Sequence, residues 1–225
     1  MGVVATKHVA DACRARGIKA VAVTAGYMCA SPRAEFYAHM DAANIDLKGF
    51  TERFYAQTCS AHLKSVLDTL TFVKHHTNVW LEITNLLIPD LNDSDEELDA
   101  MTGWVVEELG PDVPMHFTAF HPDYKMLDRP PTPSKTLTRA RSIALGNGVR
   151  YAYTGNVHDH DGGSTYCPGC GALVIERDWY SLGRYRLTRD ACCETCGSRV
   201  PGVFAGAPGG WGRRRLPVRL MSSAD

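Results

Sequence analysis

The stretch Val79-Trp-Leu-Glu-Ile-Thr-Asn-Leu-Leu-Ile-Pro89 predicts a β-strand over 79–88 that stops at the proline. Ser94 and Glu97 follow it with the spacing of a capping box, in which each side chain satisfies a backbone N–H group at a helix start. The helix they begin carries apolar residues on one face and ends at 110–111, a Gly-Pro pair. The segment is therefore one strand followed by one helix.

The same order of elements recurs on both sides of this unit. Apolar runs predict strands at 18–23, 44–47, 115–120 and 149–154, and helical spacing predicts helices at 6–16, 31–40, 60–73 and 133–146. We expect the 18–23 strand to be buried and Ser60 to cap the helix that it precedes. Regular alternation of strand and helix predicts a parallel sheet with helices outside, either doubly wound or part of a β/α barrel.

In both of these architectures the chemistry lies where the strands end, at their carboxyl ends. The predicted strand ends are 24–27, 46–48, 84–85 and His121. Asp46 and Lys48 are two residues apart, so strand alternation places both side chains on the same face. A carboxylate and an ammonium group there can bind an amino-acid moiety, and the alternative is a salt bridge at a strand end.

Two Cys-x-x-Cys-Gly units near the C-terminus define a different kind of segment. Their cysteines are Cys167, Cys170, Cys193 and Cys196, and the segment between the two pairs has the length of a β-hairpin, with Gly183 near its expected turn. Four thiolates with this spacing predict a closed, structural zinc site of the zinc-ribbon type. Adventitious thiols, a redox disulfide and an Fe–S site are the alternatives, and Cys192 is a second candidate for the Cys193 position.

The composition excludes several classes of function. The 225 residues include 24 basic and 25 acidic side chains, so no global charge favours nucleic acid, which makes nucleic-acid binding an unlikely function. No apolar run approaches the length of a membrane span, so we expect no membrane association. Paired cysteines without a secretory signal predict a reducing, cytoplasmic location.

Several of these segments together match one known family. They are Val21–Tyr27, Asn44–Lys48, Trp80–Pro89, His116–Pro122 and Tyr153–His158. They resemble radical SAM enzymes of the AmmeMemoRadiSam system, relatives of the pyruvate formate-lyase activating enzymes, and the two cysteine pairs match that group's zinc ribbon. The resemblance implies an α/β fold: a partial (β/α) radical SAM-type barrel lacking its first strands at 1–157, a four-cysteine zinc ribbon at 158–204 and a flexible basic tail at 205–225.

The resemblance also implies a mechanism. Family members use a [4Fe–4S] cluster to cleave S-adenosylmethionine to a 5′-deoxyadenosyl radical, which abstracts hydrogen from a substrate. Asp46 and Lys48 match the element that helps to hold S-adenosylmethionine, and His121 matches a histidine near the adenosine. An isolated histidine at the His121 position is equally typical of a structural residue.

One departure from the family limits this expectation. The family's cluster ligands, Cys-x-x-x-Cys-x-x-Cys, do not occur in this chain, and Cys13, Cys29 and Cys59 are spaced too widely to replace them. We therefore expect a family member shortened at its N-terminus that does not cleave S-adenosylmethionine alone. An open sheet edge at the missing strands predicts self-association.

The resemblance names Memo-like and AMMECR-like proteins as partners. The alternative function is a zinc-ribbon binding module that contacts a protein or nucleic acid. A third interpretation is a different β/α-barrel enzyme in which Lys48 forms a Schiff base.

Overall fold

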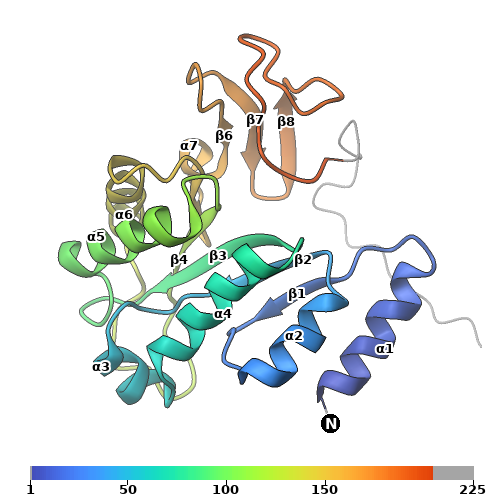
Figure 1. Ribbon diagram of the computed structural model, residues 1–225. Coiled ribbons are helices and arrows are strands. Elements are labelled where there is room, and N and C mark those ends of the chain that lie inside the picture. The colour runs from blue at the N-terminus through green and yellow to red at the C-terminus, as the bar shows by residue number, and fades with distance from the viewer. Residues whose placement is uncertain (1, 205–225) are drawn as a thin grey trace, which may run out of the picture.

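The computed structural model describes residues 2–204, and the predicted flexible tail lies outside them. Its main feature is a five-stranded sheet in the order β1-β2-β3-β4-β5, all parallel (Figure 1). The strands are β1 (Val21–Thr24), β2 (Ala42–Asp46), β3 (Trp80–Leu87), β4 (Met115–Ala119) and β5 (Ala152–Gly155). The parallel sheet predicted from strand–helix alternation is confirmed.

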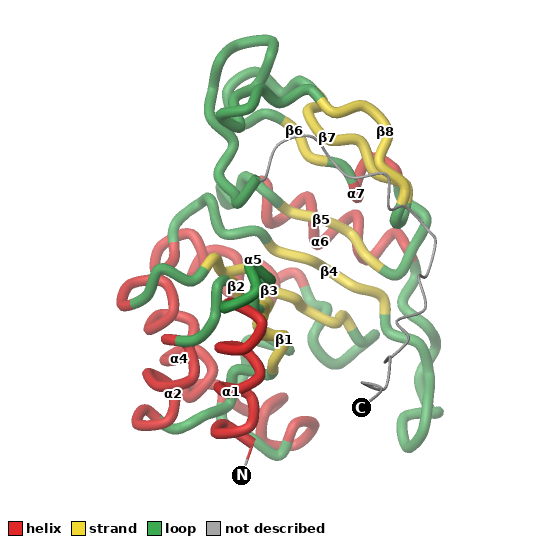
Figure 2. Tube along the Cα trace, turned by 90° about the vertical axis from the view of Figure 1, so that its right-hand side faces the viewer, coloured by secondary structure: helices red, strands yellow, loops and turns green. Residues whose placement is uncertain are grey.

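The helices connect these strands in sequence. They are α1 (Gly2–Arg14), α2 (Ala30–Ala38), α3 (Glu52–Phe54), α4 (Leu63–His76), α5 (Asp95–Trp104) and α6 (Ser134–Gly146), with π-helical turns η1 (Tyr55–Cys59) and η2 (Val105–Leu109). Viewed along the sheet, α2 and α4 lie to one side of it (Figure 2). None of the helices within residues 2–204 has the length and apolar character that crossing a membrane requires.

The two faces of the sheet have different environments. Along β3 every second residue is buried, so Leu81, Ile83 and Leu87 pack into the main core while Glu82 and Thr84 point to the other face. We call this second face the open face, because its side chains are only partly buried. Burial of the apolar side chains on the first face contributes about 1.5–3 kcal/mol each.

Two local predictions are wrong. The strand at 18–23 is not buried: β1 is an edge strand, and Val21 and Val23 are 57% and 79% exposed. Ser60 does not cap α4, since it has a left-handed conformation after η1, and α4 begins at Leu63 with His62 before it. The apolar spacing predicts helix α4 itself, but no sequence signal marks η1, the short helical segment before Ser60.

The capping box is confirmed in one of its two hydrogen bonds. Ser94 Oγ accepts from the Glu97 N–H at 3.2 Å. The Glu97 carboxylate does not bond back to Ser94 but accepts from the Phe50 N–H at 2.5 Å, which ties α5 to the loop after β2. Burial raises the pKa of Glu97, although this hydrogen bond opposes the shift.

The cysteine segment forms a separate antiparallel sheet after the short helix α7 (His160–Gly163). Its strands are β6 (Thr165–Tyr166), β7 (Leu173–Asp178) and β8 (Ser181–Tyr185). The predicted hairpin exists, but its turn is at Trp179 and Tyr180, and Gly183 lies inside β8. This antiparallel sheet lies beside β5. Tyr151, immediately before β5, belongs to the small core of the cysteine segment.

Candidate functional site

Asp46 and Lys48 lie together at the carboxyl edge of the sheet. Asp46 ends β2, and its Oδ2 atom is 2.9 Å from Lys48 Nζ, with both side chains partly exposed. Asp46 and Lys48 therefore lie side by side as expected. They also form the salt bridge that was the alternative interpretation of this pair. An exposed pair of this kind contributes about 0–1 kcal/mol to stability, so its main consequence is the charge that it presents at this edge.

The backbone of Lys48 is fixed from two directions. Its N–H group donates to the hydroxyl of Tyr55 at 3.1 Å, and its carbonyl accepts from Asn92 Nδ2 at 2.5 Å. Asn92 also donates to the Leu86 carbonyl at 2.9 Å and accepts from the Ile88 N–H at 2.7 Å. A buried asparagine thus joins the ends of two strands.

Sequence reasoning did not identify the role of Asn92. The only signal was its place in the Pro-Asp-Leu-Asn-Asp segment after a strand, which is typical of any turn. Asn85, which the sequence places near the strand end, has a similar positioning contact: its Nδ2 donates to the Leu47 carbonyl at 2.7 Å. Both asparagines therefore hold the segment that carries Asp46 and Lys48.

The π-helical turn η1 brings two further side chains toward the ion pair. Burial raises the pKa of Tyr55, and the hydrogen bond from the Lys48 N–H opposes that shift. Burial also raises the pKa of the Cys59 thiol, while the positive charge of Lys48 lowers it. The phenol and the thiol therefore stay protonated, as neutral groups beside the charged pair.

His121 lies in the loop after β4, at the same edge of the sheet. Its imidazole is exposed, and Nδ1 is 2.9 Å from the carbonyl oxygen of the adjacent Pro122. Within the described residues it has no hydrogen bond to Asp46 or Lys48. The structure therefore brings two of the three predicted cofactor residues into contact and leaves the third in an exposed loop.

The four predicted cysteines form one group. The Sγ atoms of Cys167, Cys170, Cys193 and Cys196 lie within 4.8 Å of one another, with pairs at 3.5 and 3.9 Å. A tetrahedral site with metal–sulfur bonds of about 2.3 Å places its sulfurs about 3.8 Å apart, which matches these distances. Cys192 lies outside the group, and its thiol faces the Asp190 carbonyl.

The loops around the thiols have the geometry of metal-binding knuckles. After each first cysteine the chain turns back, and the N–H groups of Gly171 and Gly197 donate to the carbonyls of Cys167 and Cys193. Both glycines have positive φ, 72° and 76°, which other residues adopt only with strain.

The thiols in this group differ in acidity. Hydrogen bonds from Ser198 lower the pKa of Cys196 to about 6, and backbone N–H groups lower that of Cys193. The Ala172 N–H lowers the pKa of Cys170, but interactions with the other three thiols outweigh it and raise the value to about 12. Thiolates are the form that binds metal, so the two most acidic thiols are prepared for ligation.

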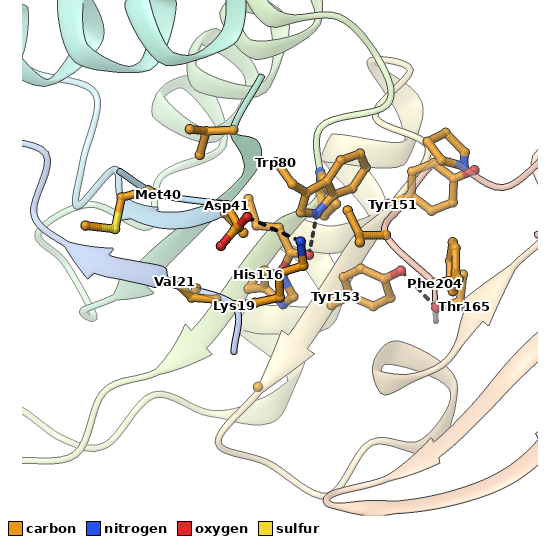
Figure 3. A pocket seen from close by; sticks show the side chains of 18 of the residues that line it. Lys19, Val21, Met40, Asp41, Trp80, His116, Tyr151, Tyr153, Thr165 and Phe204 are labelled. Carbon is orange, nitrogen blue, oxygen red and sulfur yellow. Dashed lines mark hydrogen bonds and ion pairs between the residues drawn. The ribbon is translucent and has the colours of Figure 1, made fainter. Parts of the chain in front are cut away.

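A cavity of about 1310 Å³ lies elsewhere, between the open face and the cysteine module. Glu82, His116 and Tyr153 from the sheet and Arg177 from β7 line it. Figure 3 shows His116 and Tyr153 among the lining side chains. Asp46, Lys48 and His121 do not line it, so the predicted cofactor residues and this cavity are separate. No sequence motif pointed to this cavity, because its walls come from strands far apart in the chain.

Comparisons of the sequence with known proteins give a relative but no family model. No protein-family model matches the chain. An uncharacterized protein of Methanocaldococcus jannaschii is 42% identical over 188 residues, covering 83% of this chain and 55% of that protein. The chain therefore spans about half the length of this curated relative.

A solved structure has a similar fold. A domain of pyruvate-formate lyase-activating enzyme from Bacteroides vulgatus matches with a TM-score of 0.57 at 15% identity, covering 67% of this chain and 89% of that domain. The main sheet therefore has the fold of a pyruvate-formate lyase-activating enzyme domain. The predicted fold class is confirmed, since the cysteine group is also compatible with a small zinc-binding module.

Proposed function

We propose that this chain is a radical SAM-type protein of the AmmeMemoRadiSam group whose carboxyl sheet edge binds S-adenosylmethionine. The observation that carries the proposal is the likeness of its parallel sheet to a pyruvate-formate lyase-activating enzyme domain. The Asp46–Lys48 pair supports it, because it lies at the edge where α/β sheets of this kind bind ligands.

The residues at this edge fit the amino-acid part of that cofactor. The Lys48 ammonium suits its carboxylate, and Asp46 suits its amino group, with hydrogen bonds between oppositely charged groups. The contacts from Tyr55 and Asn92 hold the Lys48 backbone in place before a ligand arrives. His121, which is exposed at the same edge, is the proposed contact to the adenosine.

The described residues do not fit a [4Fe–4S] cluster beside Asp46 and Lys48. The one group of three or more metal-ligating side chains in residues 2–204 is the C-terminal group of four cysteines, on the other sheet. Cys59 is near Lys48 but stands alone. When bound in the intact family, the cluster supplies the electron that cleaves S-adenosylmethionine, and we propose no such cleavage by this chain alone.

The four cysteines are the proposed ligands of a structural zinc ion. Their sulfur spacing suits a tetrahedral ion, and four protein ligands leave no open position for catalysis. Zinc in such a site contributes directly to folding. The metal would therefore stabilise the module beside β5 and take no part in the reaction.

Calorimetric titration with S-adenosylmethionine tests the proposal. Lys48→Ala should weaken binding by about tenfold, the effect of losing one charged hydrogen bond. Lys64→Ala is the matched control, because it removes an exposed lysine–aspartate pair of 2.7 Å on α4. Absence of binding, or equal losses in the two variants, would refute the assignment of this edge.

The partners proposed by resemblance are Memo-like and AMMECR-like proteins in the cytoplasm. The alternative function, a binding module, has one observation in its favour: the hairpin tip exposes Trp179, Tyr180 and Leu182. Aromatic side chains of this kind are enriched at binding surfaces. A salt-sensitive gel shift of labelled RNA by the full chain would favour this alternative.

A further inference from the structure

The cavity on the open face contains an organised Glu–His pair. Glu82 Oε2 is 2.8 Å from His116 Nε2, and Glu82 Oε1 accepts from the indole N–H of Trp80 at 2.9 Å. Burial tends to raise the pKa of Glu82, but the hydrogen bonds from His116 and Trp80 and the charge of Arg177 together lower it. Glu82 is therefore ionised and fixes the orientation of the imidazole.

This orientation leaves one ring atom for a ligand. In the neutral imidazole that donates from Nε2 to Glu82, Nδ1 of His116 is the remaining ring acceptor, and no described residue hydrogen-bonds to it. The side chain is 31% exposed, and it lines the cavity. Together with the free lone pairs of Glu82, Nδ1 makes this wall rich in hydrogen-bond acceptors.

Planar groups are stacked on the same wall. The His116 and Tyr153 rings are stacked, with their planes 22° apart and their centroids 5.1 Å apart, and the Arg177 guanidinium is 5.7 Å from the Tyr153 centroid. Tyr153 is held by a 2.9 Å hydrogen bond to Thr165 of the cysteine module. Eight of the lining side chains are Phe, Trp or Tyr. Such a surface suits a flat, aromatic ligand.

The charges that line the cavity nearly cancel. Three lysine or arginine and four aspartate or glutamate side chains contribute to it. Arg14 and Lys19 both lie near one carboxylate, that of Asp41, at 3.7 and 3.4 Å. Figure 3 shows Lys19 near Asp41 and His116 next to Tyr153. A neutral ligand suits this balance better than a polyphosphate does.

We propose that this cavity binds a neutral, planar heteroaromatic molecule with N–H donors, of the nucleobase or nucleoside class. His116 accepts a hydrogen bond from the ligand through Nδ1, and Glu82 is a positioning residue that orients His116. A guanine-type base has a ring N–H and an exocyclic amino group, both donors, so it matches the acceptor wall. The volume of about 1310 Å³ is sufficient for a whole nucleoside.

Guanosine and inosine are the probes for the full zinc-loaded chain, with binding followed by calorimetry. Guanosine should bind, and inosine, which lacks the exocyclic amino group, should bind about tenfold more weakly. His116→Phe keeps an aromatic ring next to Tyr153 but removes Nδ1, so it should weaken guanosine binding by about tenfold or more. His62→Phe is the matched control, since it removes an exposed Glu–His pair of 2.6 Å.

A second measurement separates positioning from folding. In the free protein, Glu82→Gln should change the chemical shifts of the His116 ring nitrogens, which report the tautomer by NMR, and it should weaken guanosine binding while zinc content stays unchanged. Lys48→Ala should leave guanosine binding unchanged, so this site and the carboxyl edge can fail independently. No guanosine binding below about 1 mM, or equal effects of His116→Phe and His62→Phe, would overturn the proposal.

Discussion

Replacing Asn92 by alanine tests whether one buried side chain organises the carboxyl edge. Asn92 is 1% exposed and makes hydrogen bonds to the backbone of Lys48, Leu86 and Ile88. Each lost bond costs about 1 kcal/mol when a buried backbone group is left without a partner. The three together predict a loss of about 3 kcal/mol in the free energy of unfolding.

Urea unfolding followed by circular dichroism, at a fixed zinc concentration, measures this loss. With a slope of about 2 kcal/mol per molar urea, the midpoint should fall by about 1.5 M. Asn147→Ala is the control, because Asn147 also makes three contacts, but the two to Asp99 are exposed, so water replaces them there. It should cost about 1 kcal/mol.

The same variant connects stability to the proposed function. Without the Asn92 amide, the Lys48 carbonyl loses its partner, and the affinity for S-adenosylmethionine should fall while Asn147→Ala leaves it unchanged. A destabilisation below about 1 kcal/mol, or equal effects in the two variants, would refute the reasoning that Asn92 joins the strand ends.

Three further predictions follow from other parts of the chain. Cys193→Ser should lose the bound zinc in a metal assay, whereas Cys192→Ser should retain it, because only the Cys193 thiol lies in the four-sulfur group. Because the pKa of Glu82 is lowered in the folded protein, its contribution to stability is complete above the ordinary pKa of 4.5 and is lost as the pH falls through the lower folded value. Glu82→Gln should therefore reduce the fall of the free energy of unfolding at acidic pH. An unchanged fall in this variant would contradict the prediction. Val23→Lys on the exposed edge strand should reduce self-association in light scattering, and a wild-type chain that is already monomeric would remove the basis for that prediction.

The regular elements could be predicted because their signals are local. The strand expected at 79–88 is observed at Trp80–Leu87, since a bounded apolar run fixes a strand from its own residues. The exposure of Val23 could not be predicted in this way, because its sequence is that of a buried strand and only the sheet order makes it an edge. The hairpin turn at Trp179–Tyr180 was missed because glycine is a strong turn signal and Gly183 was the nearest one.

The candidate sites show the same difference between local sequence signals and features that depend on the fold. The four cysteines could be identified from spacing, and Asp46 and Lys48 could be placed on one face, because both patterns lie within a few residues of sequence. The Glu82–His116 pair joins neighbouring strands 34 residues apart, so its existence depends on the register of β3 and β4. Nothing in either strand alone indicates which polar residues meet.

The cysteine module and the main sheet depend on each other through β5. Tyr151, immediately before this strand, is 4% exposed and belongs to the small core of the module, while Tyr153 carries the hydrogen bond to Thr165 and the contact with Arg177. Removing the proposed zinc ion would therefore loosen the part of the cavity wall that Arg177 and Thr165 of the module contribute. The Asp46–Lys48 edge is built from β2, η1 and the loop before α5, and none of these contacts involves the module. A chelator should thus weaken the proposed nucleoside binding and leave the proposed S-adenosylmethionine binding unchanged, because only the first site includes side chains of the module.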